Sequence, residues 1–332
     1  MSATLSKIFR VKVLSANIYT KRDIRELKRI LPEPKYKIDF SNSEIKNRKG
    51  LLMFCKDANG IITTNYQKFD RYVLANLKQL RIISFNGYWV DTVDRDLARK
   101  ASIVVTNVPD YHIDVLADHT MTLILSSIRK VPLLERMVRQ GQFNSVVRSL
   151  NLRSISNLNL GIIGFGKTGQ ALAKRSLGFG FKNVFAYDPY TQDWQFRLLN
   201  VKRKRNLEDL LATSDVITLH IGLTNETFHM FDRKMFNRMK KGTIIVNTSR
   251  EEIIEERALI DAIHDGTVSF AGIDVFESEP LSKNSPLLKE KNVVLTPHVA
   301  AFSEDSRLYQ LKECAARIKE LAENKEIKNR LV

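Results

Sequence analysis

The chain has 332 residues with 53 basic and 37 acidic side chains, a formal net charge of +16 and 43% hydrophobic residues. This length is enough for two domains with substantial cores, and the hydrophobic content is that of a globular protein. The apolar segments are far shorter than a membrane span, and residues 1–10 lack the apolar run of a signal peptide, so we expect a cytoplasmic protein that contacts no membrane.

The first third of the chain alternates between strand and helix patterns. Residues 8–15 alternate in polarity as a strand does, and residues 23–31 have helical spacing before two prolines. The pattern then predicts strands at 60–64, 80–85 and 103–108 and helices at 69–77 and 94–101. Such a βαβ order is typical of a parallel sheet with helices on both faces. This unit lacks a glycine fingerprint, so we do not expect it to bind a dinucleotide.

The rest of the chain predicts a second unit of the same class. A long helix over 113–130 is followed by a basic, less regular segment, 138–156, which we interpret as a linker or covering loop. The alternation then resumes, with strands expected at 183–187, 216–221, 243–248, 270–275 and 292–295 and helices at 207–212, 232–240, 255–264 and 303–324. The predicted fold is therefore α/β, with two Rossmann-like, doubly wound parallel-sheet domains.

A glycine-rich stretch, residues 158–170, predicts a strand that turns into a helix. Gly164 would permit the tight turn, Gly166 the approach of a pyrophosphate, and Gly169 close packing of helix on strand. Lys167 and Thr168 complete the motif at the start of the helix, where free amide hydrogens face the phosphates. The alternative is a glycine-rich turn between core elements.

Asp188 follows the predicted strand 183–187, about twenty residues after the last glycine. A carboxylate there binds the ribose hydroxyls of a dinucleotide and repels a 2′-phosphate, which predicts NAD rather than NADP. The alternative is an aspartate that caps its own loop.

The positive charge has two functional interpretations, attraction of acidic substrates or contact with nucleic acid. The alternative is a lysine-rich surface without a functional role. The densest cluster, Lys202–Arg205, resembles a nuclear-targeting tract but falls where a strand is expected, which favours a solvated edge. No nucleic-acid-binding signature is present. The two cysteines, Cys55 and Cys314, lack metal-site spacing, which indicates reduced thiols and no metal.

Three ionisable residues lie just past predicted strand ends, where parallel sheets bind ligands. Arg250 can hold a carboxylate with two parallel hydrogen bonds, His298 can exchange a proton near neutral pH, and Glu279 beside an imidazole would fix its tautomer and favour its charged form. Together they suit reduction of a 2-oxo acid. From position alone, Arg250 and Glu279 could equally be surface pairs and His298 a loop histidine.

Five segments and the glycine fingerprint together resemble the D-isomer-specific 2-hydroxyacid dehydrogenase family. They occur in family order through nearly the whole chain: Thr106-Asn-Val-Pro109, Asp118-His119-Thr120, Asn247-Thr-Ser-Arg250, Gly272-Ile-Asp-Val-Phe-Glu-Ser-Glu-Pro280 and Thr296-Pro-His298. The resemblance is specific because separate motifs must coincide. It implies a flavodoxin-like substrate-binding domain of residues 1–111 and 303–332, closed by the C-terminal helix, and an NAD-binding Rossmann domain of residues 112–302.

The resemblance also implies roles for individual residues. Arg250 matches the arginine that binds the substrate carboxylate and carbonyl, His298 the acid/base, and Glu279 its partner. Asp274 matches an aspartate that binds the nicotinamide carboxamide, and Thr224 and Ser249 lie in segments that match the cofactor site. Hydride would pass between the nicotinamide and C2 of the substrate, and a homodimer is expected.

Several positions depart from the family pattern. The loop that binds the substrate carboxylate usually has small residues around two glycines, but here it contains Tyr88 and Trp89. Their backbone amides could still bind the carboxylate, and their rings could either shape the pocket or pack between the domains. Glu251 replaces the glycine usual after the catalytic arginine, and Gly222 replaces a proline near the cofactor.

The closest family branch includes glyoxylate and hydroxypyruvate reductases, phosphoglycerate dehydrogenases and the C-terminal-binding corepressors. The last group suggests an alternative function, an NAD-binding protein scaffold with little or no turnover.

Overall fold

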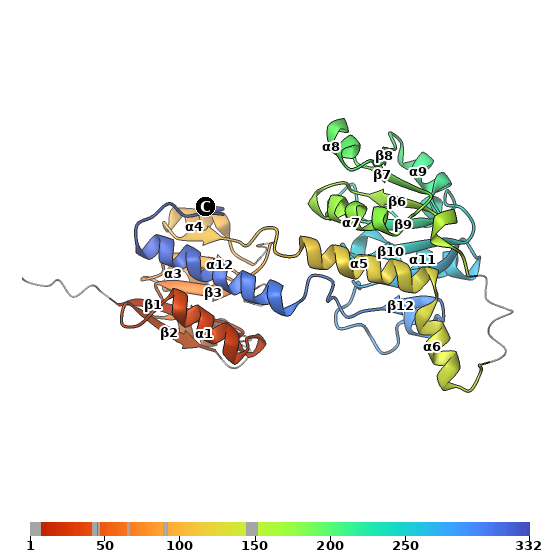
Figure 1. The fold of residues 1–332 in the computed structure, drawn as a ribbon. Coiled ribbons are helices and arrows are strands. Elements are labelled where there is room, and N and C mark those ends of the chain that lie inside the picture. The colour runs from red at the N-terminus through yellow and green to blue at the C-terminus, as the bar shows by residue number, and fades with distance from the viewer. Residues whose placement is uncertain are drawn as a thin grey trace, which may run out of the picture. The chain divides into compact units, whose positions relative to one another are not determined.

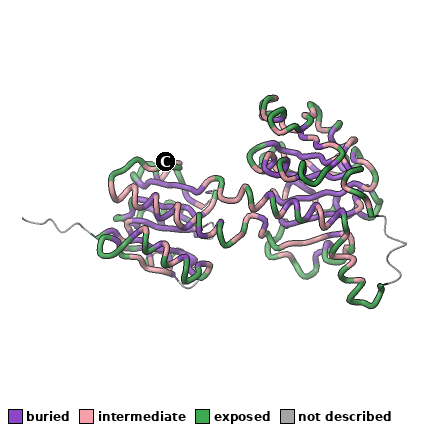
Figure 2. Tube along the Cα trace, viewed as in Figure 1, coloured by how far each residue is buried: buried purple, intermediate pink, exposed green. Residues whose placement is uncertain are grey.

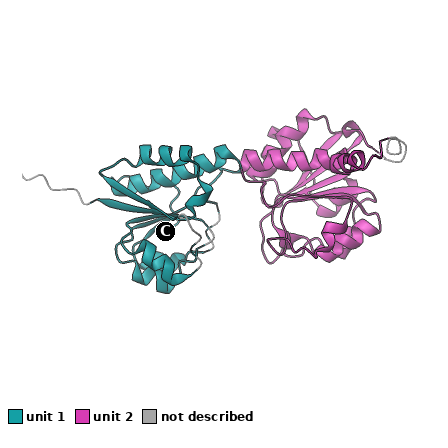
Figure 3. Ribbon diagram, turned by 90° about the horizontal axis from the view of Figure 1, so that it is seen from below, with its two compact units in different colours: residues 1–112, 303–332 teal, residues 113–302 magenta. Residues whose placement is uncertain are grey.

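The computed structural model describes residues 8–41, 45, 47–64, 67–88, 90, 92–143 and 152–332. The chain divides into two compact units, residues 1–112 with 303–332 and residues 113–302 (Figure 3). Each unit has a parallel sheet with helices packed around it (Figure 1). The predicted class, two doubly wound α/β domains of which the first is discontinuous, is confirmed.

The described part of the first unit contains a five-stranded sheet in the order β2-β1-β3-β4-β5, with every pair parallel. Its strands are β1 (Phe9–Val13), β2 (Tyr36–Phe40), β3 (Gly60–Thr63), β4 (Ile82–Phe85) and β5 (Val104–Thr106). β3 and β4 are buried along their whole length, as strands covered on both faces are. The sequence interpretation missed β2, an edge strand that is mostly half-exposed.

The helices of the first unit come from both ends of the chain. They are the 3-10 turn η1 (Ala16–Ile18), α1 (Lys21–Ile30), α2 (Arg48–Cys55), α3 (Arg71–Asn76), α4 (Arg95–Lys100) and α12 (Glu304–Ala322). The C-terminal helix α12 packs against α1 and β4. Its Leu311 and Ile318 share a core with Val11 and Val13 of β1, so the unit is complete only when residues 303–322 are in place.

The described part of the second unit contains a seven-stranded parallel sheet in the order β12-β11-β10-β9-β6-β7-β8. Its strands are β6 (Asn159–Ile163), β7 (Asn183–Tyr187), β8 (Lys202–Arg203), β9 (Val216–Leu219), β10 (Thr243–Asn247), β11 (Val268–Ile273) and β12 (Val293–Leu295). Figure 2 shows buried strands inside a more exposed helical layer. β6 pairs with both β7 and β9, and this reversal of strand order is where doubly wound sheets bind ligands.

The second unit has helices on both faces of its sheet. They are α5 (Ile113–Ile128), α6 (Val131–Arg139), α7 (Lys167–Gly178), α8 (Asp193–Leu198), α9 (Leu207–Thr213), α10 (Arg233–Phe236) and α11 (Glu256–His264), with 3-10 turns η2 (Ile155–Asn157), η3 (Glu251–Ile253) and η4 (Pro286–Lys289). α5 packs against α7, β10 and β11. The sequence interpretation missed α8 and the turns of α6 before residue 138, while residues 144–151 of the basic segment lie outside the described residues. Within the described part, no helix has the length and apolar character required to span a membrane.

Candidate active site

The glycine fingerprint forms the turn between β6 and α7. Gly164 has a φ of 90°, and a Cβ added there would lie 2.3 Å from the carbonyl oxygen of His220. A Cβ on Gly169 would lie 2.2 Å from the carbonyl oxygen of Gly164. Both contacts are far inside van der Waals distance, so only glycine permits this turn and this close packing of α7 on β6.

Gly166 differs because its neighbourhood is open. It precedes the first residue of α7, has ordinary backbone angles (φ −69°), and has no heavy atom within 4 Å of an added Cβ. Lys167 and Thr168 follow as the first two residues of the helix. An unobstructed helix N-terminus with free amide hydrogens fits the pyrophosphate of a dinucleotide.

Asp188 lies at the end of β7 and stabilises this turn. Its Oδ2 accepts a hydrogen bond from the Phe165 amide at 2.7 Å, and its Oδ1 accepts from the amides of Tyr190 and Thr191 at 2.8 and 3.0 Å. Asp188 therefore does cap its own loop, as the alternative interpretation of the sequence predicts. Each carboxylate oxygen has two lone pairs, so Oδ2 keeps one acceptor position for a ribose hydroxyl.

The basic tract, Lys202–Arg205, forms the edge strand β8 and its continuation. Arg203 and Arg205 both bond the Asp193 carboxylate, at 2.5 and 2.6 Å. Lys202 donates to Asn183 Oδ1 at 2.7 Å, and the Lys204 ammonium lies 4.6 Å from the centre of the Phe185 ring. Charged side chains along an edge strand also prevent edge-to-edge pairing. These contacts favour the structural interpretation of the tract.

His298 and Glu279 form a hydrogen-bonded pair. The distances from His298 Nδ1 to the two Glu279 carboxylate oxygens are 2.8 and 2.9 Å, and the side chains are 47% and 36% exposed. Because a carboxylate only accepts, Nδ1 carries a proton and Nε2 is the atom that can exchange a proton with a substrate. His298 has a φ of 51°, a left-handed conformation that is uncommon outside glycine and frequent at functional sites.

Arg250 lies just after β10, at the same sheet edge as the His298–Glu279 pair. β10, β11 and β12 are parallel neighbours, so the segments that follow them, which carry Arg250, Glu279 and His298, leave the sheet side by side. Asn247 fixes the Arg250 loop: its Nδ2 donates to the Arg250 carbonyl at 2.9 Å, and its Oδ1 accepts from the Ser249 amide at 3.0 Å. The Ser249 hydroxyl donates to the carbonyl of Leu219 on β9.

Asp274 is completely buried, and its hydrogen bonds hold the segment that carries His298. The sequence did not predict this structural role. Its carboxylate accepts from the Thr296 hydroxyl and from the amides of Val299 and Ala300 at 2.5, 3.0 and 2.8 Å. His119 of α5 lies 3.0 Å from Thr296 Oγ1 and 3.5 Å from Asp274 Oδ1. Burial alone would raise the pKa of Asp274, but these hydrogen bonds outweigh it and lower the pKa.

Two other predicted site residues, Thr224 and Tyr88, lie on loops. Thr224 follows β9 in an exposed turn, where its amide donates to Thr227 Oγ1 at 2.8 Å. Tyr88, in the first unit, is 40% exposed, and its carbonyl accepts from Asn107 Nδ2 at 2.7 Å. Its ring centre lies 5.7 Å from that of His112. Trp89 lies outside the described residues.

Comparisons with known proteins identify the family and the fold. Residues 121–300 match the model of the D-isomer specific 2-hydroxyacid dehydrogenase, NAD binding domain. The TT0316 protein from Thermus thermophilus superposes with a TM-score of 0.86 and 29% identity, covering 98% of this chain and 100% of that one.

Two curated relatives are similar in sequence. A glyoxylate reductase of Korarchaeum cryptofilum is 32% identical over 297 residues, 89% of each protein. A D-3-phosphoglycerate dehydrogenase of Archaeoglobus fulgidus is 36% identical over 263 residues, 79% of this chain but only 49% of that longer protein. The chain therefore belongs to the D-isomer-specific 2-hydroxyacid dehydrogenase family, whose members are NAD-dependent oxidoreductases.

Proposed function

We propose that this protein interconverts a 2-oxo acid and a D-2-hydroxy acid by hydride transfer, with His298 as the acid/base. The observation that carries the proposal is the His298–Glu279 hydrogen bond, 2.8 Å long, at the sheet edge that also bears Arg250. A positioned imidazole with one nitrogen fixed by a carboxylate is an arrangement suited to general acid–base catalysis.

The proposed chemistry divides between the cofactor and the protein. When bound, NADH supplies the hydride that adds to C2 of the oxo acid. His298 gives its Nε2 proton to the C2 oxygen as negative charge develops there, and Glu279 stabilises the imidazolium before that transfer. In the reverse direction the same nitrogen accepts the hydroxyl proton. One hydride at C2 and one proton on the oxygen together convert the carbonyl into the hydroxyl group.

Arg250 is the residue that we propose to hold the substrate. Its guanidinium can form parallel hydrogen bonds with a carboxylate and stabilise negative charge at the carbonyl oxygen. The support is its place after β10, held by Asn247. The Tyr88 and Trp89 amides are the proposed second contact to the carboxylate.

For the cofactor we propose NAD rather than NADP. Asp188 keeps an acceptor position for a ribose hydroxyl, and its charge would repel a 2′-phosphate. Around the rest of the cofactor we propose Gly164, Gly166 and Gly169 with Lys167 and Thr168 at the pyrophosphate. Farther along the chain, Thr224, Ser249 and Asp274 are proposed cofactor contacts. Comparing kcat/KM for NADH and NADPH tests this assignment, and a preference for NADPH would overturn it.

A small 2-oxo acid such as glyoxylate is the first substrate to test, because a relative 32% identical over 297 residues is named a glyoxylate reductase. We also propose a homodimer, from the resemblance to the family, and a cytoplasmic location. Sedimentation velocity would measure the assembly state.

The decisive experiment is NADH oxidation with a panel of 2-oxo acids, with and without a phosphate group. Turnover on one or more of them, lost in His298→Ala, supports the enzyme. NADH binding by calorimetry without turnover on the whole panel would instead favour the scaffold function.

A further inference from the structure

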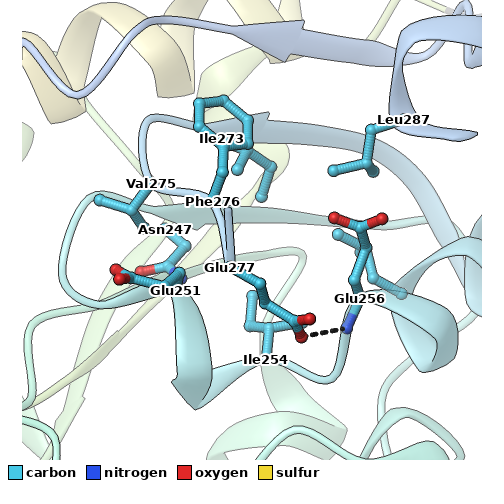
Figure 4. A pocket seen from close by; sticks show the side chains of 10 residues that line it. Asn247, Glu251, Ile254, Glu256, Ile273, Val275, Phe276, Glu277 and Leu287 are labelled. Atoms are coloured by element: carbon cyan, nitrogen blue, oxygen red, sulfur yellow. Dashed lines mark hydrogen bonds between the residues drawn. The ribbon is translucent and has the colours of Figure 1, made fainter. Parts of the chain in front are cut away.

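A small pocket lies between the carboxyl ends of β10 and β11 and helix α11, and Glu251, Glu256 and Glu277 form part of its wall (Figure 4). Its volume is about 20 Å³, enough for roughly one water molecule. Small-molecule sites typically measure hundreds of cubic ångströms. This pocket is therefore too small for a substrate or a cofactor.

Arg203, a member of the basic tract, contacts the loop that carries Asp188. Its Nη2 donates to the Asp188 carbonyl at 3.0 Å, and its Nη1 donates to Asp193 Oδ1 at 2.5 Å. The Arg203 side chain is 17% exposed. Arg205, by contrast, is 72% exposed and bonds the other oxygen of Asp193. Of the two arginines, Arg203 is therefore the one fixed beside the proposed ribose site.

Arg203 also stacks on two buried aromatic rings. Its guanidinium carbon lies 4.9 Å from the centre of the Phe196 ring on α8, a helix that packs against β8 (Figure 1). The Phe196 ring stacks in turn on Phe165, with 4.4 Å between ring centres and 16° between ring planes. Both rings are almost completely buried, and a cation is attracted to the negative face of such a ring. The stack therefore connects β8 to the glycine turn, in which Phe165 separates Gly164 from Gly166.

The contacts of Arg203 and Phe165 meet again at Asp188. The Phe165 amide donates to Asp188 Oδ2 at 2.7 Å, whereas Arg203 bonds the main-chain carbonyl of the same residue. Asp188 is thus held from two sides, through its carboxylate by the glycine turn and through its backbone by β8. The aromatic stack joins these two supports.

We propose that Arg203 is a positioning residue that holds Asp188 in the orientation required to bind a ribose hydroxyl. The inference rests on the proposed NAD site. Arg203 fixes the backbone of residue 188 directly, and through the stack it fixes Phe165, whose amide occupies one lone pair of Oδ2. The remaining lone pair then has a defined direction toward the cofactor. One residue of the basic tract thereby serves the cofactor site without contacting the cofactor.

An arginine beside this aspartate could instead bind the 2′-phosphate of NADP. The geometry favours positioning, because Nη1 and Nη2 of Arg203 already donate to Asp193 and to the Asp188 carbonyl. The Asp193 carboxylate also neutralises the guanidinium, so Asp188 keeps its repulsion of a phosphate.

The test compares Arg203→Met with Arg205→Met in the full-length protein. Both changes remove one cation from Asp193, but of the two arginines Arg203 is the one that bonds Asp188 and stacks on Phe196. Calorimetry gives the Kd of NADH and of NADPH without any substrate. Steady-state kinetics separates KM for NADH from kcat, and thermal denaturation checks that each variant is folded.

In Arg203→Met we expect the Kd and KM of NADH to rise about tenfold, the usual effect of losing one hydrogen bond to a charged group. The kcat should stay unchanged, and the preference for NADH over NADPH should narrow because Asp188 is less firmly held. Arg205→Met should change the Kd less than about twofold. Arg203→Lys should be intermediate, since lysine keeps the charge but loses the planar stack and the paired donors. If Arg203→Met does not fold, Arg203→Lys decides.

A double-mutant cycle with Asp188→Ala shows whether Arg203 acts through Asp188. In the Asp188→Ala background, Arg203→Met should add little further loss of NADH affinity. Additive losses, or an unchanged Kd in the single Arg203 variants, would overturn the proposal. A larger loss for NADPH than for NADH would also overturn it, in favour of direct phosphate binding. A wild-type protein that binds no NADH would contradict the proposed cofactor and this inference together.

Discussion

Arg307 of α12 donates from Nε to Oδ2 of Asp23 on α1 at 2.9 Å, although 284 residues separate them in sequence. Their side chains are only 11% and 2% exposed. The same oxygen accepts from the Thr20 amide and hydroxyl at 2.8 and 2.9 Å, so the ion pair is joined to the N-terminal cap of α1. This contact ties the last helix to the first segment of the discontinuous unit.

Replacement of Arg307 by methionine should destabilise the protein. The change would leave Asp23 buried without its cation, which typically costs about 3 kcal/mol of unfolding free energy. Lys312→Met is the matched control, since Lys312 pairs with Glu26 between the same helices at an exposed site, where an ion pair contributes little to stability. Urea denaturation measures both, and equal losses would contradict the importance of the buried pair.

The same pair predicts how stability depends on acid. Burial would raise the pKa of Asp23, but hydrogen bonds from Thr20 and Arg307 outweigh it and lower the pKa below its usual 3.8. A depressed carboxyl pKa stabilises the fold fully above the unfolded value, and the stabilisation is lost as the pH falls through the folded value. We expect unfolding free energy to fall below about pH 4, less steeply in Arg307→Met, and a slope unchanged by the substitution would refute this assignment.

Two alanine substitutions in one turn should affect different properties, one NADH binding and the other thermal stability. Gly166→Ala meets no atom within 4 Å, so the fold should keep its Tm while the methyl group obstructs the pyrophosphate and weakens NADH binding. Gly164→Ala would place a Cβ 2.3 Å from the His220 carbonyl oxygen at a φ of 90°, so it should lower Tm. Calorimetry and thermal denaturation separate these outcomes, and NADH binding unaffected by Gly166→Ala would argue against the phosphate site.

Loss of the His298 imidazole should lower turnover by about a hundredfold or more. NADH affinity should remain, since the glycine turn is untouched. His264→Ala is a fitting control because His264 also bonds a glutamate, Glu290, at 2.9 Å, but on the exposed surface at the end of α11. Steady-state rates of both variants test this, and full activity in His298→Ala would remove that residue from the mechanism.

Arg250→Lys retains the charge but loses the planar pair of donors. We expect kcat/KM for oxo acids to fall by about a hundredfold. Arg257→Lys, at an exposed position on α11 where the arginine pairs with Asp261, should have no effect. A rise in KM alone, with kcat unchanged, would show that Arg250 binds substrate without stabilising the transition state.

The sequence predicted fold elements well where strands are apolar and buried. The predicted strand 183–187 coincides with β7 because its apolar run ends at Asp188. β2 was missed because Lys37 and Asp39 interrupt it, as an edge strand permits. The contacts to Asp274 come from α5 and from the segment after β12, and no local pattern encodes contacts between segments so distant in the chain.

The place of α12 has a consequence for synthesis on the ribosome. The second unit is contiguous, so all its strands can pair once residue 302 has emerged. The core around β1 stays incomplete until Leu311 and Ile318 have been synthesised. Before that point its apolar surface is exposed and can bind chaperones. We therefore expect the second domain to mature first, although the first begins the chain.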